Sequence, residues 1–402
     1  MPKAVPRPRS GTRTTMKACM LAYTFYDADN RVRRYAEALA KRGDQVDAIA
    51  LARKGQPAFE VLNGVRVFRI QTRVIDESGP VSYLVKLLVF FLRSTWFLTR
   101  KHFQEPYDMV HVHSIPDFEV FAAVIPKLMG AKVILDLHDI VPEFYGSKFK
   151  IGSGSVVFKL LVLLEKVSCG YSNHVIISNH LWHEKIVKRS VRPDKCTTMI
   201  NYPDPSIFWP RPAPARLNDD FLMCYPGSFG WHQGLDLAIQ AVAILQDKAP
   251  NLRLLIVGDG SDRERLKGMV KELHLEDRVT IKGFVPMEEV AEIMSSIDLG
   301  VVPKRADPFG NEAFSTKIME FMSMGVPVIA ARTRVDEFYF TENLLQFFEP
   351  GRAEDLAAKI LFLMHNPACR VALREASAEF IAHNNWDVRK QEYFDLVDRL
   401  IA

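Results

Sequence analysis

The sequence lacks the features that mark several broad classes of protein. Its 402 residues contain five cysteines, which lie far apart and form no Cys-x-x-Cys or Cys/His ligand pattern. A disulfide framework and a zinc site are therefore not indicated, and a reducing compartment is favoured. The 52 basic residues nearly balance the 48 acidic ones, giving a net charge of +4 that does not point to nucleic acid.

Targeting and membrane-spanning segments are also missing. The first fifteen residues are basic and have no apolar stretch, which predicts a disordered basic tail rather than a secretory signal. The most apolar segment, Tyr83–Leu98, is interrupted by Lys86 and Arg93, short of the roughly 18–20 uncharged residues that a span needs. We expect a cytoplasmic protein, with peripheral attachment to the inner face of the membrane left open.

What the sequence does contain is a regular alternation of short apolar runs with helical patterns. This alternation predicts an α/β fold of two Rossmann-like domains in tandem, each with a mainly parallel sheet. A proline-rich segment separates the two series of strands. The strands are expected at residues 18–23, 46–50, 65–70, 109–113, 132–135, 174–177 and 197–200, and then at 221–225, 252–257, 279–281, 299–302 and 328–330.

The expected domain boundaries follow from this alternation. They are a tail (1–15), an N-terminal domain (16–205), a linker (206–220), a C-terminal domain (221–385) and a last helix (386–402) that could cross back to the N-terminal domain. Because ligands of such sheets bind at the carboxyl ends of the strands, the loops after the strands should carry the chemistry.

Two glycine-rich loops follow strands of the second domain. Tyr225–Gly234, which begins with Gly227 and Ser228, could bring backbone N–H groups to a phosphate. Gly258 and Gly260 would let a flat base lie against the backbone. The steric needs of a tight turn explain these glycines as well or better, and the dinucleotide fingerprint Gly-x-Gly-x-x-Gly is absent.

The strongest pattern runs from Pro303 to Glu320, where a strand, a polar loop and a helix follow one another. Ser315 is expected at the N-cap of the helix. Lys317 falls in the first turn, where the helix dipole disfavours a cation unless an anion binds there; a solvent-facing lysine, at roughly a few tenths of a kcal/mol, is the alternative. Glu312 lies in the loop and Glu320 on the helix, a spacing that is less common by chance than either carboxylate alone.

The first domain offers polar residues after a buried strand as well. His138, with Asp139 beside it, could donate to a sugar hydroxyl or transfer a proton, and a structural role at the strand end is the alternative. His111 and His113 share one strand face and could be a metal pair, but no third ligand is evident in the sequence. We therefore expect no metal site.

Taken together, these residues resemble a known family. Glu312 and Glu320 match the E-x7-E pattern of retaining glycosyltransferases, and residues 312–331 are similar to glycosyltransferase family 4, whose members have the GT-B fold. This resemblance implies an interdomain cleft, with an acceptor-side N-terminal domain and a C-terminal domain that binds the nucleotide sugar. Further similar segments are Asp29–Leu51, Asp136–Phe144, Ile200–Phe208 and Leu254–Gly260.

The resemblance implies roles for individual residues. Glu312 and His138 would be the catalytic residues near the transferred sugar. Glu320 would contact the donor ribose, and Gly258 would lie near the base. The implied donor-binding set is Gly227, Ser228, Gly258, Phe314, Ser315, Thr316, Lys317 and Glu320, with Asp139, Lys304 and Arg305 as accessory residues.

The chain departs from the family pattern at two cationic positions. Gln233 stands where the family often has lysine, and Ser228 stands where an arginine usually helps to bind the diphosphate. Because a buried diphosphate needs compensating cations, Lys317 is the first candidate, followed by Lys304 and Arg305.

The predicted function is retaining transfer of a sugar from a UDP- or GDP-sugar to an acceptor hydroxyl in polysaccharide or glycolipid assembly, without cofactor or metal. The apolar and basic segment Tyr83–His102 could lie in a membrane interface near a lipid-linked acceptor; a core-packed helix with a basic solvent face is an equal alternative. Two other functions stay open: a sugar-nucleotide epimerase of GT-B architecture, and an inactive sugar-nucleotide-binding subunit.

Overall fold

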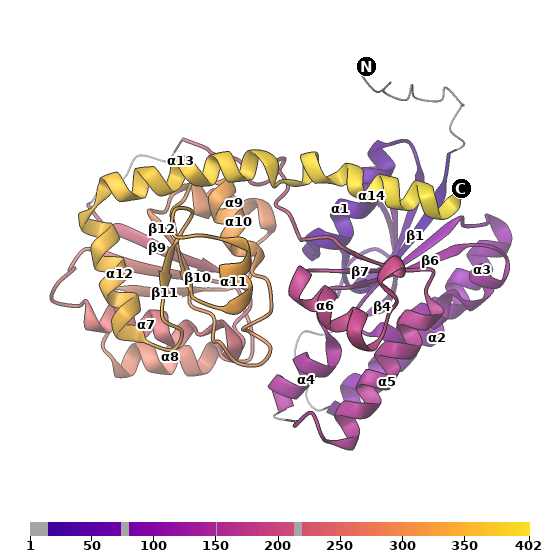
Figure 1. Ribbon diagram of the computed structural model, residues 1–402, viewed down its shortest axis with the longest axis horizontal. Coiled ribbons are helices and arrows are strands. Elements are labelled where there is room, and N and C mark those ends of the chain that lie inside the picture. Colours follow the sequence, from indigo (N-terminus) through magenta and orange to yellow (C-terminus); the bar gives the residue numbers. More distant parts are fainter. Residues whose placement is uncertain (1–14, 74–79, 150, 213–218) are drawn as a thin grey trace, which may run out of the picture. The chain divides into compact units, whose positions relative to one another are not determined.

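The computed structural model describes residues 15–73, 80–149, 151–212 and 219–402, and Figure 1 gives the arrangement of their elements. Its internal contacts divide the chain into two units, one comprising the residues up to Leu135 with Leu400–Ala402, the other Asp136–Arg399. This division falls inside a strand, whereas the sequence places a linker at 206–220. Part of that linker, 213–218, lies outside the described residues, as does the expected tail up to residue 14.

The first sheet has eight strands in the order β3-β4-β2-β1-β5-β6-β7-β8. Strand β1 pairs in parallel with β2 and β5, while the short edge strand β3 runs antiparallel to β4. The strands are β1 (Lys17–Phe25), β2 (Gln45–Ala52), β3 (Phe59–Leu62), β4 (Val65–Thr72), β5 (Met109–His113), β6 (Lys132–Leu137), β7 (His174–Ile177) and β8 (Cys196–Thr198). The helices in this part of the chain are η1 (Tyr26–Ala28), α1 (Asn30–Lys41), α2 (Pro80–Gln104), η2 (Asp117–Ala123), α3 (Val124–Leu128), α4 (Val141–Phe149), α5 (Val156–Tyr171), α6 (His180–Arg189) and η3 (Pro193–Lys195).

The second sheet has six strands in the order β11-β10-β9-β12-β13-β14, and every neighbouring pair is parallel. The strands are β9 (Phe221–Pro226), β10 (Leu252–Val257), β11 (Val279–Lys282), β12 (Leu299–Val302), β13 (Val328–Ala331) and β14 (Gln346–Phe348). The helices are η4 (Trp231–Gln233), α7 (Leu235–Ile244), α8 (Arg263–Glu272), α9 (Met287–Ser295), α10 (Thr316–Ser323), α11 (Arg334–Tyr339), α12 (Ala353–His365), α13 (Pro367–His383) and α14 (Trp386–Ile401).

The second sheet is buried on both faces because its strands are apolar at nearly every position. One hydrophobic cluster joins alternate strand residues such as Met223 to helices α7, α8 and α12. The residues between them, such as Cys224, join a second cluster with α9 and α10. Helices on both faces of a parallel sheet are the arrangement that such continuous apolar strands require. The predicted α/β fold with two Rossmann-like sheets is therefore confirmed, with the short edge strands β3 and β14 added to it.

Helix α2 is longer than the apolar segment singled out in the sequence. Residues Ser82–Gln104 are long and apolar enough to cross a membrane by length and composition, with 22% of the most apolar window buried. This finding corrects the expectation that no segment qualifies, since the two basic residues inside the segment do not bring its hydropathy below that of a span. Length and composition alone are weak evidence, because a core helix passes the same test.

Candidate functional site

The start of α10 gathers hydrogen-bond donors for which the described part of the chain supplies no acceptor. Ser315 occupies the N-cap position, as expected, but its side chain makes no capping hydrogen bond. Its Oγ is buried without a hydrogen-bond partner. The first backbone N–H groups of a helix have no acceptor within it, so Thr316 and Lys317 add two more donors there. A hydroxyl and a helix N-terminus can thus donate hydrogen bonds to a bound ligand, and an anionic ligand suits them best.

Lys317 places a cation beside these donors. Its Nζ lies 5.2 Å from the centre of the Tyr225 ring, and among the described residues it has no ion-pair partner. Its chain passes so close to Gly227 that a Cβ there would lie 2.2 Å from the Lys317 Cε. Burial lowers the pKa of Lys317, while the nearby Glu320 carboxylate acts in the opposite direction. This ammonium is therefore held against the loop after β9 with its charge only partly compensated.

The other two expected cations are already engaged within the protein. Lys304 is buried, donates to the carbonyl oxygen of Ala313 (2.7 Å) and forms an ion pair with the Asp336 carboxylate (2.8 Å). Arg305 forms an ion pair with Asp236, and its guanidinium carbon lies 3.8 Å from the centre of the Trp231 ring. Lys304 and Arg305 thus already have carboxylate partners, whereas Lys317 forms no ion pair among the described residues.

The glycines of the two loops allow the backbone segments to approach each other. A Cβ on Gly258 would lie 1.9 Å from the carbonyl oxygen of Gly227, and one on Gly260 would lie 2.7 Å from the backbone nitrogen of Phe229. Both glycines also have positive φ, at +139° and +159°. The steric explanation of these glycines is therefore visible directly. Ser228 beside them is exposed, and its carbonyl oxygen accepts a hydrogen bond from the Tyr225 hydroxyl (3.0 Å).

Gln233 and His232 line the same loop. The Gln233 amide lies 2.8 Å from the Tyr225 hydroxyl and 2.9 Å from the His232 ring, which continues the hydrogen-bonded chain. Burial lowers the pKa of His232, so this ring is a neutral neighbour of the Lys317 ammonium. Gln233 supplies no charge where a lysine is frequent in the family, which leaves the ammonium of Lys317 as the charged group facing Gly227.

Glu312 lies in the loop before α10 and is held by two basic side chains. Lys185 on α6 forms an ion pair with its Oε2, and Arg334 Nη1 lies 3.2 Å from its Oε1. Its backbone carbonyl oxygen also accepts a hydrogen bond from the Asn179 side chain (3.1 Å). The Glu312 carboxylate is thus fixed between two cations. Sequence reasoning missed these partners, because nothing in the local pattern around residues 179–185 marks them.

His138 follows β6, as expected from the apolar run before it. Its Nε2 lies 3.3 Å from an Asp136 oxygen, and its carbonyl oxygen accepts a hydrogen bond from the Ser178 hydroxyl (2.8 Å). Asp139 is partly buried next to it. The aspartate two residues upstream can fix the orientation of the imidazole, which suits a group that contacts a substrate hydroxyl.

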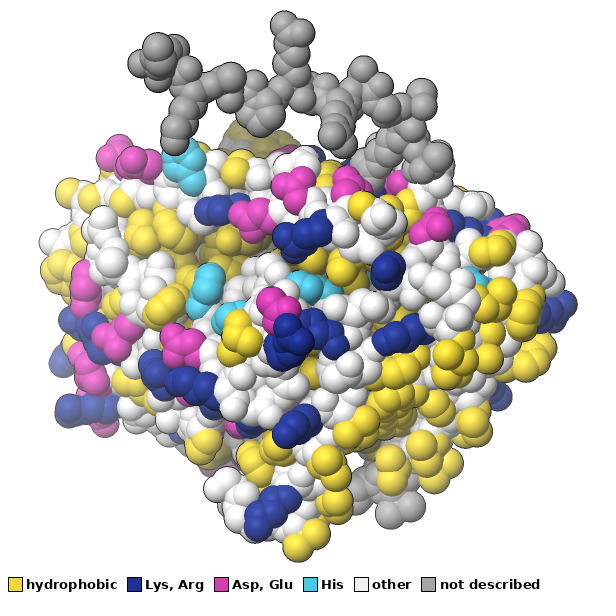
Figure 2. Space-filling model, turned by 45° about the vertical axis from the view of Figure 1, so that its right-hand side comes forward, with side chains coloured by type: hydrophobic (Ala, Val, Ile, Leu, Met, Phe, Trp, Pro, Cys, Tyr) yellow, Lys and Arg dark blue, Asp and Glu magenta, His cyan; other side chains and the backbone are white. Residues whose placement is uncertain are grey.

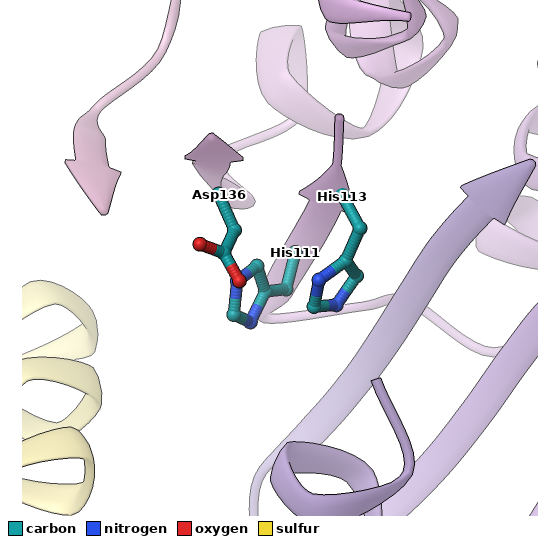
Figure 3. A group of neighbouring side chains, drawn as sticks. All are labelled: His111, His113 and Asp136. Carbon is teal, nitrogen blue, oxygen red and sulfur yellow. The ribbon is translucent and has the colours of Figure 1, made fainter. Parts of the chain in front are cut away.

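Asp136 also supplies the third polar group that the sequence did not show near the two histidines of β5. The ligand atoms of His111, His113 and Asp136 lie within 4.8 Å of one another, and Figure 3 shows the carboxylate turned toward the His111 ring. By residue type the three could hold a metal ion. The neighbours β5 and β6 lie side by side in the sheet, which explains a juxtaposition of residues far apart in the sequence.

The surroundings of the two histidines are aromatic and basic. The Tyr35 ring packs against both imidazoles, with centroids 5.2 Å from His111 and 6.1 Å from His113. The buried guanidiniums of Arg31 and Arg34 each lie 5.4 Å from the centre of that same ring. The two imidazoles are thus packed against an aromatic ring inside the first sheet.

Comparisons with known proteins bear on the whole chain. Residues 28–201 match the family model "Glycosyl transferase 4-like domain", and residues 211–380 match "Glycosyl transferases group 1". Among curated relatives, a component of the human phosphatidylinositol N-acetylglucosaminyltransferase is 23% identical, over 84% of this chain and 66% of the relative. The gpi3 component of the Schizosaccharomyces pombe enzyme is 27% identical, over 82% and 68%. The chain thus spans about two thirds of the length of these relatives.

Solved structures agree in fold. Sucrose-phosphate synthase from Thermosynechococcus elongatus superimposes with a TM-score of 0.77 at 21% identity, over 96% of this chain and 99% of that one. HepE from Anabaena, in complex with UDP and glucose, gives a TM-score of 0.72 at 16% identity, over 96% and 100%. The two family matches take in nearly all of both sheets, and the chain therefore belongs to the group 1 glycosyltransferases, with a glycosyltransferase 4-like N-terminal domain and the GT-B fold.

Proposed function

We propose that this glycosyltransferase transfers a sugar from a nucleoside diphosphate sugar, with retention at the anomeric carbon and without a metal ion, to a hydroxyl of a lipid-linked acceptor. The observation that carries the proposal is the start of α10. There, the Ser315 hydroxyl, which has no hydrogen-bond partner among the described residues, and the Lys317 ammonium flank a helix N-terminus.

The diphosphate of the donor fits the charge at this position. A helix N-terminus carries about half a positive charge and unpaired N–H groups, and Lys317 adds a full charge. Together they would stabilise the charge that develops on the departing diphosphate, which is the largest task in this chemistry. Binding the anion would also relieve the cost of burying an ammonium whose charge is only partly compensated. Lys317 would thus replace the two cations that the family often has at the positions of Ser228 and Gln233.

The transfer needs no separate base, because the leaving diphosphate can take the acceptor proton. The bond between the anomeric carbon and the diphosphate oxygen breaks, the acceptor oxygen bonds to that carbon, and the acceptor proton passes to the leaving phosphate oxygen. Glu312 and His138 would position the sugar through its hydroxyls, and Glu320 would contact the ribose. The fixed orientation of Glu312 between Lys185 and Arg334 supports a positioning role rather than a nucleophilic one, because those contacts occupy both of its carboxylate oxygens.

A lipid-linked acceptor is supported by the relatives. The names of the human and fission-yeast relatives specify phosphatidylinositol. The sulfoquinovosyl transferase SQD2 of Arabidopsis thaliana, another relative, is 22% identical over 90% of this chain. These relatives are all transferases, which does not favour the epimerase or the inactive binding protein. An acceptor in a bilayer would place the enzyme on the inner membrane face.

A donor screen tests this function. The purified protein is incubated with UDP- and GDP-sugars, with and without EDTA, in the presence of lipid-linked and soluble acceptors, and released nucleoside diphosphate is measured. We expect acceptor-dependent release that survives EDTA, with the same anomeric configuration in donor and product. Turnover that EDTA abolishes, or an inverted product, would contradict the proposal, and conversion of the donor to an epimer without acceptor would replace it.

A further inference from the structure

Helix α2 has two apolar faces, of which the residues that the structure describes cover only one. Its inner face, with Leu87, Phe90 and Leu98, is buried against the first unit. The helix is tied to β4 at several points: Arg93 donates to the carbonyl oxygen of Ile70 (3.1 Å), and the Gln71 side chain donates to that of Lys86 (3.1 Å). Helix α2 therefore lies along the domain surface.

The buried face of α2 also carries a polar anchor. The hydroxyl of Ser94 donates to the Glu119 carboxyl of η2, and both side chains are completely buried. Burial raises the pKa of Glu119 to about 8. At neutral pH this carboxyl is mainly uncharged, so the inner face of α2 packs on the domain without a buried charge. A helix fastened in this way could not cross a bilayer without losing these contacts, which argues against the span that its length permits.

The outer face of α2 is apolar and uncovered by any described residue. Leu84, Leu88, Leu92 and Trp96 follow one another at helical spacing and are 50%, 45%, 66% and 61% exposed. The neighbouring helix α3 packs on α2 and adds further exposed side chains at its end, Leu128 and Met129. Contiguous exposed apolar surface of this kind marks an interaction site in a soluble domain. We call it the α2 surface, made up of Leu84, Val85, Leu88, Leu92, Trp96, Leu128 and Met129.

The charged residues of α2 itself are all of one sign. Pro80–Gln104 contains no Asp or Glu, whereas Lys86, Arg93, Arg100 and Lys101 are all basic. The Arg100 guanidinium carbon lies 5.4 Å from the centre of the Trp96 ring, which joins the basic and apolar parts. Figure 2 shows hydrophobic side chains gathered at the lower right, with basic ones among them.

A helix with an exposed apolar face, a tryptophan and only basic charged residues has the pattern of helices that lie in the plane of a membrane interface. We propose that the α2 surface seats the enzyme in the interface of a bilayer containing anionic lipid, with α2 parallel to the membrane plane. This inference rests on the proposed function and deepens it, because an enzyme with a lipid-linked acceptor would meet that acceptor at a membrane surface. The partner is a lipid surface rather than another protein, because Pro80–Gln104 carries four basic residues and no acidic one, a charge that fits anionic headgroups.

Vesicle flotation tests the surface directly. The full chain is mixed with phosphatidylcholine vesicles, or with phosphatidylcholine vesicles containing phosphatidylglycerol, at low and high salt. We expect at least tenfold more protein to float with the phosphatidylglycerol vesicles, less at high salt, and release by an alkaline carbonate wash. Absence of flotation, or retention after the wash as a spanning protein would show, would overturn the proposal.

Matched variants locate the binding. Leu92→Glu/Trp96→Glu changes two exposed positions of the α2 surface and should lower flotation tenfold or more. Phe362→Glu/Val388→Glu changes two similarly exposed apolar positions on α12 and α14 and should float like the wild type. Equal flotation of the first variant and the wild type would overturn the proposal. So would a wild-type dimer that the first variant converts to monomer, since the surface would then join two copies of this chain.

A UDP-binding measurement separates this proposal from the proposed function. Both double variants should bind UDP as the wild type does, because neither changes the residues around α10. Flotation as predicted from a protein that binds neither UDP nor GDP would support the membrane surface and count against the proposed donor. Loss of both flotation and UDP binding in Leu92→Glu/Trp96→Glu would show a folding defect. In that case the single variant Trp96→Glu is measured, and we expect it to lower flotation about threefold with UDP binding intact. Full flotation of Trp96→Glu would overturn the proposal.

Discussion

Lys304 and Lys317 stand at the two ends of the same loop, and their surroundings differ. Lys304 is buried between the Asp336 carboxylate and a backbone carbonyl, so its charge is matched within the protein. Lys317 is close to the Tyr225 ring and to Gly227, where no carboxylate forms an ion pair with it in the described part of the chain. Burial lowers the pKa of both lysines.

This difference indicates which lysine holds the fold and which one serves a ligand. A buried charge with a close partner of opposite sign stabilises the fold, and removing either partner leaves the other buried without a counter-charge. A buried charge without such a partner is unfavourable in the free protein and gains when an anion arrives. The two lysines should therefore respond to substitution in opposite ways.

The largest expected effect is on stability, in Lys304→Met. The variant leaves the Asp336 carboxylate buried without its cation, so the free energy of unfolding should fall by about 3–5 kcal/mol. Chemical denaturation of the variant and the wild type measures this. The double variant Lys304→Met/Asp336→Leu should recover part of the loss, and a single variant as stable as the wild type would refute the structural role.

Lys317→Met should show the reverse pattern. Its kcat/KM for the donor should fall about 10²–10³-fold, the range seen when one group that stabilises a developing anion is removed. Its stability should stay equal to that of the wild type or rise, because a buried charge that is only partly compensated has been removed. Lys267→Met, at an exposed lysine of α8, is the control and should change neither quantity. An active Lys317→Met enzyme would rule out the assigned role.

Ser315→Ala tests the neutral part of the same site. A hydrogen bond to a charged group contributes about 1.5–3 kcal/mol, so donor affinity should fall roughly tenfold or more. The free protein should lose no stability, since no described residue forms a hydrogen bond with this hydroxyl. Ser295→Ala on α9 serves as control, because the Ser295 hydroxyl donates to the backbone carbonyl oxygen of Glu292 in the same helix. Titration calorimetry and thermal unfolding report the two quantities, and a destabilised variant with normal donor affinity would show that Ser315 is structural.

The smallest effect concerns pH. Only the protonated Lys317 attracts a diphosphate, and its pKa is lowered by burial, so donor affinity should fall as pH rises, at a lower pH than for an ordinary lysine. Bound diphosphate should raise that pKa and move the fall toward higher pH. Lys317→Arg, which does not titrate in this range, should lack the fall. A donor affinity that is flat through the alkaline range in the wild type would contradict this account.

Local patterns predicted the framework of the second domain well. The signals that located the β12–α10 loop all lie within short stretches of sequence. They are the apolar strands, the proline-rich segment between the domains, and the spacing of Glu312, Ser315 and Glu320. The role of Lys304 could not, because it depends on Asp336, which reaches it only through the fold. Ser315 shows the same limit: its N-cap position follows from the pattern, but the absence of a capping bond does not.

Long-range pairing explains the remaining differences. Asp136 joins His111 and His113 because β6 lies next to β5, an adjacency that the order of the chain does not specify. The outer face of α2 was equally hidden, since both of its faces are apolar and hydrophobic periodicity could not say which face the domain covers. The edge strand β3 was missed because a short strand with exposed Phe59 and Val61 lacks a buried pattern.

The central claim is that the start of α10 binds the donor diphosphate through Lys317 without a metal ion. Titration calorimetry of UDP and GDP into the wild type and Lys317→Met, both in EDTA, tests it most directly. The account predicts that at least one nucleotide binds the wild type in EDTA and binds Lys317→Met about a hundredfold more weakly, in line with the loss of one group that stabilises an anion. Binding that requires Mg²⁺, or equal affinities for the two proteins in EDTA, would contradict it.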